Sequence, residues 1–197
     1  TYFSDVLLPA EQDGGEAHAF ADDMNVFKQF DTDMDNEVVL EDMQRTRRNV
    51  HKWGRQNRVI FDAGKEHLVV LHPLSGEGDA FKLLGCMVDT KLTMQYAVDA
   101  ILAAARPKTR AILRTRAHYD VPTLISQFKT HVWGLIEIHQ GAIFHAAATH
   151  LSKLDHLQDS FLRELGISCE EAFIKFNFAP VCLRRDIGIL GMLHKRV

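Results

Sequence analysis

Two adjacent carboxylates, Asp22 and Asp23, follow the apolar pair Phe20-Ala21 and are the side chains of this sequence best suited to chemistry. Side chains alternate across a strand, so these carboxylates point to opposite sides unless the backbone twists between them. One can then face a cleft while the other orients it. Carboxylates at a turn are hard oxygen ligands suited to Mg²⁺, which also binds substrate phosphates. The pair indicates a candidate Mg²⁺ site, and a solvated surface pair is the alternative.

A second acidic pattern points to a different cation. Asp31, Asp33 and Asp35 stand at positions 1, 3 and 5 of a twelve-residue segment that ends at Asp42, which resembles an EF-hand Ca²⁺ loop. Asn36 replaces the glycine of that loop, and Asp42 replaces its bidentate glutamate with a shorter side chain. This segment is either a Ca²⁺-binding module without enzymatic activity or an acidic helix N-terminus that suits the helix dipole.

Basic residues gather in two stretches that are poor in acids. Arg106, Arg110 and Arg114 recur every four residues and share one face if the helix continues across Pro107. Such faces neutralise phosphates without reading sequence, and a solvated helix face is the alternative. The candidate nucleic-acid-binding residues are Arg45, Arg48, Lys52, Arg106, Lys108, Arg110, Arg114 and Arg116.

The net charge of −3 conceals a strong asymmetry along the 197 residues. Residues 1–44 hold twelve acids and one base, Lys28, whereas the remainder carries 22 bases and 14 acids. This distribution favours a cation in the first part and a polyanion as partner of the second. A content of 46% hydrophobic and 25% charged residues is typical of globular proteins and excludes collagen, coiled-coil rods and general disorder.

The sequence lacks two features that bear on where in the cell the protein works: a membrane-helix-like apolar run and paired cysteines. No apolar run approaches the roughly 20 residues of a membrane helix, so we expect no membrane partner. The three cysteines form no CxxC pair, which argues against a disulfide framework and a cysteine zinc site. We therefore expect an intracellular protein, nuclear or cytoplasmic, that is not secreted.

Hydrophobic periodicity predicts an α+β fold in two domains, 1–90 and 91–197. The first contains a helix that is capped by Asp33 or Asp35 and ends at Gly54. Its expected strands are 6–8, 19–21, 59–61, 68–71 and a strand or strand pair at 81–88. The second is nearly all helical, with a break at Pro107, a helix opened by Pro122, a long helix at 144–165 and a short basic tail after Pro180.

The order of four motifs resembles the C-terminal half of a reverse transcriptase of the non-LTR (LINE-type) retrotransposons. Phe-Ala-Asp-Asp at 20–23 is similar to the polymerase Y/F-x-D-D hairpin. The helix to Gly54 and the segment 59–65 resemble the next palm motif, and 81–85 resembles the F/Y-K-Y-L-G primer grip. The helical remainder is similar to a thumb, with 161–165 as its closing segment. The resemblance covers nearly the whole chain.

This resemblance implies a partial polymerase palm (hairpin, helix and small antiparallel sheet) at 1–90 and a helical thumb-like region at 91–197. The parent protein would be an RNA-directed DNA polymerase, a nucleotidyltransferase that extends a DNA primer on an RNA template with deoxynucleoside triphosphates and two Mg²⁺ ions. Asp22 would be a metal ligand, Asp23 its supporting neighbour, and Lys65 the acid or charge partner at the leaving pyrophosphate. The residues that would position the primer end are Phe81, Lys82, Leu83, Leu84 and Gly85.

The sequence departs from the family pattern at two positions: Asp62 stands where asparagine is usual, and Glu66 where threonine is usual. In the family, another essential carboxylate lies upstream of the segment that this chain resembles. A two-metal site needs carboxylates from both strands. We therefore expect residues 1–197 to be inactive alone, and a domesticated nucleic-acid-binding remnant is a further alternative.

Overall fold

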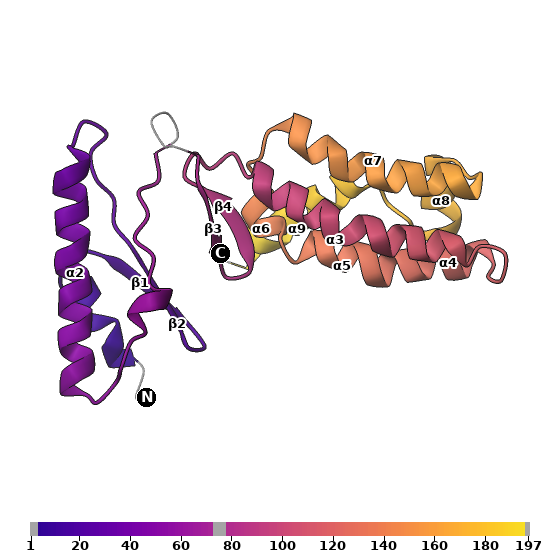
Figure 1. Ribbon diagram of the computed structural model, residues 1–197. Helices are drawn as coiled ribbons and strands as arrows, with labels where there is room; N and C mark the ends of the chain where they lie inside the picture. The colour runs from indigo at the N-terminus through magenta and orange to yellow at the C-terminus, as the bar shows by residue number, and fades with distance from the viewer. Residues whose placement is uncertain (1–3, 73–77, 196–197) are drawn as a thin grey trace. The chain divides into compact units, whose positions relative to one another are not determined.

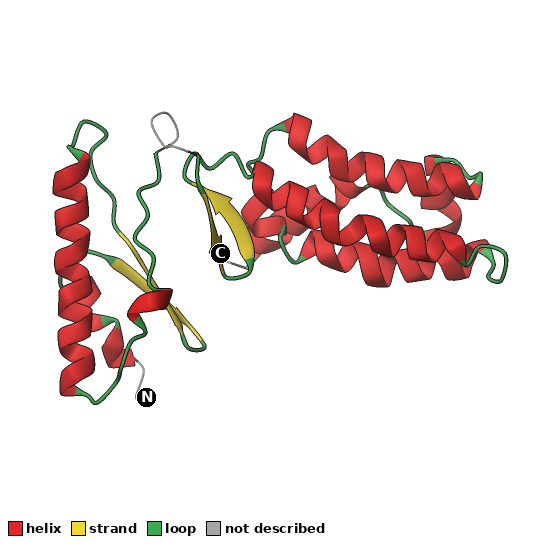
Figure 2. Cartoon of the chain, viewed as in Figure 1, coloured by secondary structure: helices red, strands yellow, loops and turns green. Residues whose placement is uncertain are grey.

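The computed structural model describes residues 4–72 and 78–195 of a chain that divides into two compact units, Thr1–Val70 and Leu71–Val197 (Figure 1). The fold is α+β: helices dominate, and the described strands form two antiparallel pairs (Figure 2). The boundary between the units lies between residues 70 and 71, whereas the sequence analysis placed it at 90. The difference arises because the second strand pair packs on the helices of the second unit. No described helix is long and apolar enough to cross a membrane.

The first unit places a hairpin beside one long helix. Its elements are η1 (Ser4–Val6), α1 (Leu8–Glu11), β1 (Glu16–Phe20), β2 (Asp23–Phe27), α2 (Asn36–Gln56) and η2 (Ala63–Lys65). The carboxylate of Asp35 accepts a hydrogen bond from the backbone N–H of Glu37 at 2.9 Å, which confirms the expected cap of α2. Val39, Thr46 and Gly54 are the residues that this helix buries.

The hairpin lies later in the sequence than expected. The prediction of strands at 6–8 and 19–21 around a long turn is wrong in its first half, since Pro9 helps to open the short helix α1. The strands that pair are β1 and β2, with Phe20 opposite Asp23 and a two-residue turn between them. The inner face carries Ala17, which is buried opposite Val26.

Residues 59–61 and 68–71 are not strands, although their composition favours strands. A strand needs a neighbour to pair with, and within residues 4–72 and 78–195 these segments have none. Instead, Val59 donates its N–H to the Gly54 carbonyl at 2.8 Å. Phe61 packs so closely that a Cβ on Gly54 would lie 2.7 Å from its ring. The expectation that α2 ends at Gly54 is therefore wrong, because the helix continues to Gln56. Gly54 instead provides a notch for Phe61 in the last turn of the helix.

The second unit is a helical bundle preceded by a hairpin. Its elements are β3 (Ala80–Leu83), β4 (Cys86–Asp89), α3 (Gln95–Arg114), α4 (Val121–Phe128), the π-helical η3 (Lys129–Trp133), α5 (Gly134–Glu137), α6 (Gln140–Ile143), α7 (Ala148–Leu165), α8 (Cys169–Phe176) and α9 (Val181–His194). Of the two alternatives expected at 81–88, a strand or a strand pair, the structure has the pair. The long helix expected at 144–165 begins four residues later.

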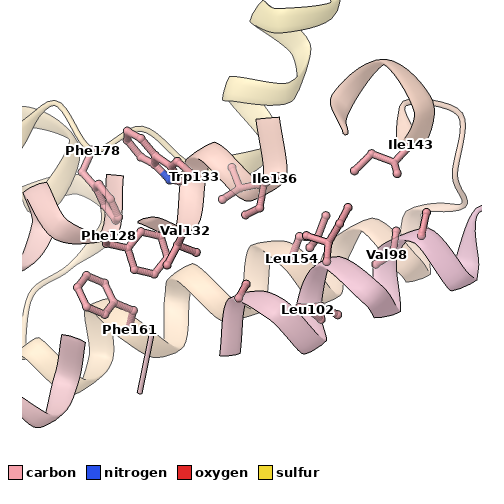
Figure 3. Close-up of a cluster of buried hydrophobic side chains, with 14 of the residues drawn as sticks. Val98, Leu102, Phe128, Val132, Trp133, Ile136, Ile143, Leu154, Phe161 and Phe178 are labelled. Carbon is pink, nitrogen blue, oxygen red and sulfur yellow. The ribbon is translucent and has the colours of Figure 1, made fainter. Parts of the chain in front are cut away.

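Aromatic side chains fill one end of the bundle core, as Figure 3 shows. The rings of Phe128 and Phe161 lie 4.4 Å apart between centroids, and Trp133 stacks on Phe178 at 4.6 Å. Trp133 also donates its indole N–H to the buried amide oxygen of Gln158 at 2.8 Å. These contacts join α4, η3, α7 and the segment before α9 into one core.

The helix α3 continues through Pro107, which corrects the expected break. A proline inside a helix removes one backbone hydrogen bond and costs about 3 kcal/mol. Pro107 is exposed, so water can solvate the carbonyl it leaves unpaired. The opposite face buries a stripe from Val98 to Ile112 that is apolar except for Thr109, and this burial outweighs that cost.

The residues after Pro180 form a helix rather than the expected basic tail. Arg185 donates both guanidinium ends to Asp155 of α7, at 2.7 and 3.1 Å. Arg184 lies 3.7 Å above the centre of the Trp133 ring. Two of the basic residues of the tail thus hold α9 to the bundle.

Candidate active site and nucleic-acid interface

Asp22 and Asp23 lie at the tip of the β1–β2 hairpin, Asp22 in the turn and Asp23 at the start of β2. Both are exposed, and the ring of Phe20 beside them is 69% exposed. Ala21 has a φ of +56°, a left-handed value that costs a residue with a Cβ roughly 1–2 kcal/mol. The hairpin therefore presents two carboxylates to solvent from a strained turn, a type of strain found often at functional sites.

An ion cluster closes the base of this hairpin. Lys28, directly after β2, has a side chain only 4% exposed, and its Nζ lies 3.0 Å from Oδ2 of Asp13 and 2.6 Å from Oδ2 of Asp42. Arg45 also pairs with both carboxylates. The Thr46 hydroxyl, together with Lys28 and Arg45, lowers the pKa of Asp13 to about 2 against the opposing effect of burial. The cluster thus ties both arms of the hairpin to α2.

The sequence analysis missed this cluster, although one signal was available. Lys28 is the single base among the first 44 residues, which hold twelve acids. A lone cation in such surroundings is expected to find carboxylate partners, and its burial is tolerated only when it does. The cluster also uses the charge of Arg45, which the sequence assigned to nucleic-acid binding.

The residues of the calcium alternative have other contacts. Asp42 pairs with Lys28 and Arg45, and Asp35 caps α2. Asp31 and Asp33 are exposed. Across residues 4–72 and 78–195 no three His, Cys, Asp or Glu side chains come together as a metal-binding group. The hairpin tip likewise offers two neighbouring carboxylates and not a closed cage.

The Lys65 turn is the 3₁₀ segment η2. Asp62 accepts a hydrogen bond from the Gly64 N–H at 3.0 Å and so caps this turn. The side chain of Lys65 is 85% exposed, and its Nζ lies 3.8 Å from Oδ2 of Asp62. The aspartate that replaces the usual asparagine thus makes the same kind of local contact that an asparagine oxygen could make.

Glu66, the second departure from the family pattern, is held by two residues of α2. Its Oε2 accepts a hydrogen bond from Arg47 Nε, and its Oε1 lies 2.7 Å from His51 Nε2. The His51 ring also meets the edge of Phe61, with centroids 5.6 Å apart. Residues on both sides of the Lys65 turn are therefore fixed to the same helix.

The five residues proposed to position a primer end form the tip of the β3–β4 hairpin. Leu84 and Gly85 have φ values of +46° and +85°, which is the pattern of a type I′ turn. Phe81 and Leu83 pack against the bundle core, whereas Lys82 and Leu84 face solvent. The hairpin thus exposes one lysine and one leucine from a base that is fixed to the helices.

A buried carboxylate joins this hairpin to α3. Asp89, 1% exposed, accepts backbone hydrogen bonds from Lys91, Thr93 and Met94 at 2.9–3.1 Å and one from the Thr93 hydroxyl. Burial opposes the charge, but the hydrogen bonds from Thr93, Met94 and Lys91 outweigh it and lower the pKa of Asp89. This side chain holds a loop in which Leu92 and Met94 both have positive φ.

Basic side chains separate into paired and free groups. Arg106, Arg110 and Arg114 are exposed, have no ion-pair partner among the described residues, and share one face of α3 because the helix is continuous. Lys108 is exposed on another face, and Arg116 pairs with Glu164 at 2.8 Å. On α2, Arg48, Lys52 and Arg55 form a second exposed stripe without described partners.

Comparison of the chain with protein-family models, with curated proteins and with solved structures gives no match.

Proposed function

We propose that this chain is the C-terminal palm and thumb part of an RNA-directed DNA polymerase of the non-LTR retrotransposon type. The observation that carries the proposal is the position of Asp22 and Asp23 at the tip of a tight hairpin, with a strained residue before them. A polymerase must present carboxylates in this way, because they have to reach metal ions that also contact substrate phosphates.

The chain order of the other elements supports the same function. A long helix follows the hairpin, then the Lys65 turn, then a second hairpin whose tip carries 81–85, and then the bundle. Asp22, with Asp23 in support, would hold Mg²⁺, which when bound would activate the primer hydroxyl and neutralise phosphate charge. Lys65, with its ammonium exposed, would meet the leaving pyrophosphate.

The free basic stripes support a nucleic-acid partner. Consecutive arginines of the Arg106, Arg110 and Arg114 stripe are about 6 Å apart along the helix axis, at 1.5 Å per residue. A continuous row of unpaired guanidinium groups suits a phosphate backbone and carries no sequence information. The template–primer duplex is therefore the proposed ligand of this face of α3.

Primer extension on an RNA template tests the proposal, in a polypeptide that joins this chain to the upstream carboxylate motif. We expect Asp22→Ala to lower the extension rate by several orders of magnitude, because a lost metal ligand removes both nucleophile activation and charge stabilisation. Asp31→Ala, an equally exposed aspartate, is the matched control and should extend normally. Extension at the unmodified rate by the Asp22 variant would overturn the proposal.

A further inference from the structure

We propose that Glu66 is a positioning residue for Lys65, and that it fixes the Lys65 turn to the same helix that anchors the Asp22–Asp23 hairpin. The proposal rests on the function proposed above, which gives Lys65 its chemical role. Glu66 does not touch the reacting atoms in this scheme and acts through the backbone of the turn.

Both carboxylate oxygens of Glu66 lie against α2: Oε2 accepts a hydrogen bond from Arg47, and the buried Oε1 is close to His51 without hydrogen-bond geometry. Arg47 and His51, which contact them, are four residues apart and therefore lie one above the other on the helix. The Glu66 side chain is 26% exposed, so these contacts are partly shielded from water. One turn further along α2, Phe61 fills the notch at Gly54. The segment 62–65 is thus held at both ends.

The hairpin is anchored on a largely opposite face of the same helix. Asp42, Arg45 and Thr46 hold Lys28 and Asp13 at the hairpin base. At about 100° per residue, these positions point away from Arg47, His51 and Gly54 by roughly two-fifths of a turn on average. In the view of Figure 1 the hairpin and η2 are both drawn to the right of α2. One rigid helix therefore sets the position of the turn relative to the carboxylates.

The arrangement leaves the Lys65 ammonium available. The contacts fix the residues on each side of the turn, while the long contact with Asp62 is the one ion pair of Lys65 among the described residues. A group that meets a leaving phosphate needs this combination of a fixed backbone and a free charge. In this proposal the glutamate at position 66, where the family has threonine, serves to hold the turn in position.

The test measures the position of Lys65 relative to the hairpin tip in the full 197-residue chain. A nitroxide on Asp22→Cys, with the exposed Cys169 and Cys182 changed to serine, broadens NMR signals according to their distance from it. We expect Glu66→Gln to change the broadening at Lys65 by about twofold or more, because the released turn samples other positions. Signals of β1 and of α2 before residue 47 should keep their broadening.

Two variants separate positioning from simple loss of stability. Glu41→Gln, an exposed glutamate of α2 without a described partner, is the matched control and should leave Lys65 unchanged. The charge-reversed pair Arg47→Glu with Glu66→Arg should restore the broadening at Lys65. If Glu66→Gln does not fold, Arg47→Gln removes only one of the two contacts and gives the same readout.

Unaltered broadening at Lys65 in Glu66→Gln, or in Arg47→Gln where that replaces it, overturns the positioning role. A different result also overturns this role. In it, the broadening of β1 and α2 changes together with that of Lys65, and the charge-reversed pair does not restore the broadening at Lys65. Primer extension in the polypeptide that includes the upstream carboxylate motif tests the proposed function separately. Extension at the unmodified rate by the Asp22→Ala variant would count against the metal site and leave the nitroxide result standing.

Discussion

The Nζ atom of Lys28 lies 2.6 Å from Oδ2 of Asp42, and only 4% of the lysine side chain is exposed. This partly buried ion pair, in which Asp42 is 22% exposed, joins the end of β2 to the second turn of α2. A β-hairpin alone is marginally stable in water, so a two-stranded sheet needs such an anchor to hold its tip in one place. The candidate carboxylates Asp22 and Asp23 therefore depend on a contact at the far end of their own strands.

Removal of Lys28 should destabilise the first unit. We expect Lys28→Met to lower its free energy of unfolding by about 3 kcal/mol or more, because Asp13 and Asp42 then keep only Arg45 as a cationic partner. Amide hydrogen exchange of α2 measures this change without interference from the second unit. Lys52→Met, exposed on the same helix, should stay within about 0.5 kcal/mol, and an equal effect of both variants would contradict the role of the cluster.

The same cluster predicts an acid-sensitive first unit. Asp13 has a folded pKa of about 2, below its ordinary value of 3.8, so the unfolded chain takes up the proton first as the pH falls. Its contribution, roughly 2 kcal/mol, is complete above the unfolded value and is lost as the pH falls from there through about 2. Urea unfolding of α2 between pH 5 and pH 2 measures the loss. Asp13→Asn should remove most of this dependence and Asp31→Asn little of it; identical pH profiles would refute the assignment.

Ala21→Gly should relieve the strain at the hairpin tip. Glycine adopts positive φ without the Cβ penalty, so we expect the hairpin to gain up to about 1 kcal/mol. Ala19→Gly, in the middle of β1, should instead lose stability, because glycine weakens a strand interior. Hydrogen exchange of the β1–β2 amides compares the two variants. A loss of protection in the Ala21 variant would mean that the turn is not strained.

The Arg106 stripe should dominate the salt dependence of duplex binding. Each phosphate contact adds about −0.9 to the slope of log affinity against log salt for B-form DNA. We expect replacement of Arg106, Arg110 and Arg114 by alanine to flatten that slope by about 2–3 units. Arg116→Ala, whose guanidinium already pairs with Glu164, should change it by less than about one unit. Fluorescence anisotropy with a template–primer duplex measures both, and an unchanged slope in the triple variant would remove this face from the interface.

Asp89→Ala should destabilise the second unit. The variant leaves the N–H groups of Lys91, Thr93 and Met94 without their acceptor and releases a loop with two residues at positive φ. We expect a loss of about 2–4 kcal/mol, measured by hydrogen exchange of α3. Asp120→Ala, an exposed helix cap with one such contact, should lose about 1 kcal/mol. A smaller loss at Asp89 than at Asp120 would contradict the assignment.

Local patterns in the sequence were sufficient where a single element decides the outcome. The period of the apolar residues and the cap at Asp35 predicted α2, and Leu84-Gly85 lay within the expected strand pair. The common face of Arg106, Arg110 and Arg114 also followed from spacing alone, provided that the helix was continuous. These features depend on neighbours within a few residues, which is the range over which helix and turn preferences act.

Tertiary packing decided the features that local patterns got wrong. The strand-like residues 59–61 and 68–71 found no strand to pair with, and Phe61 instead entered the notch at Gly54. Pro107 stayed inside α3 because a buried stripe on the opposite face outweighs one missing hydrogen bond. The contacts of Lys28 and Glu66 join residues between 14 and 19 positions apart in the sequence. The sequence thus determined which side chains could carry charge and chemistry. Only folding decided which charges are neutralised by a partner and which remain free. That outcome depends on distances between residues far apart in the chain, which no local pattern contains.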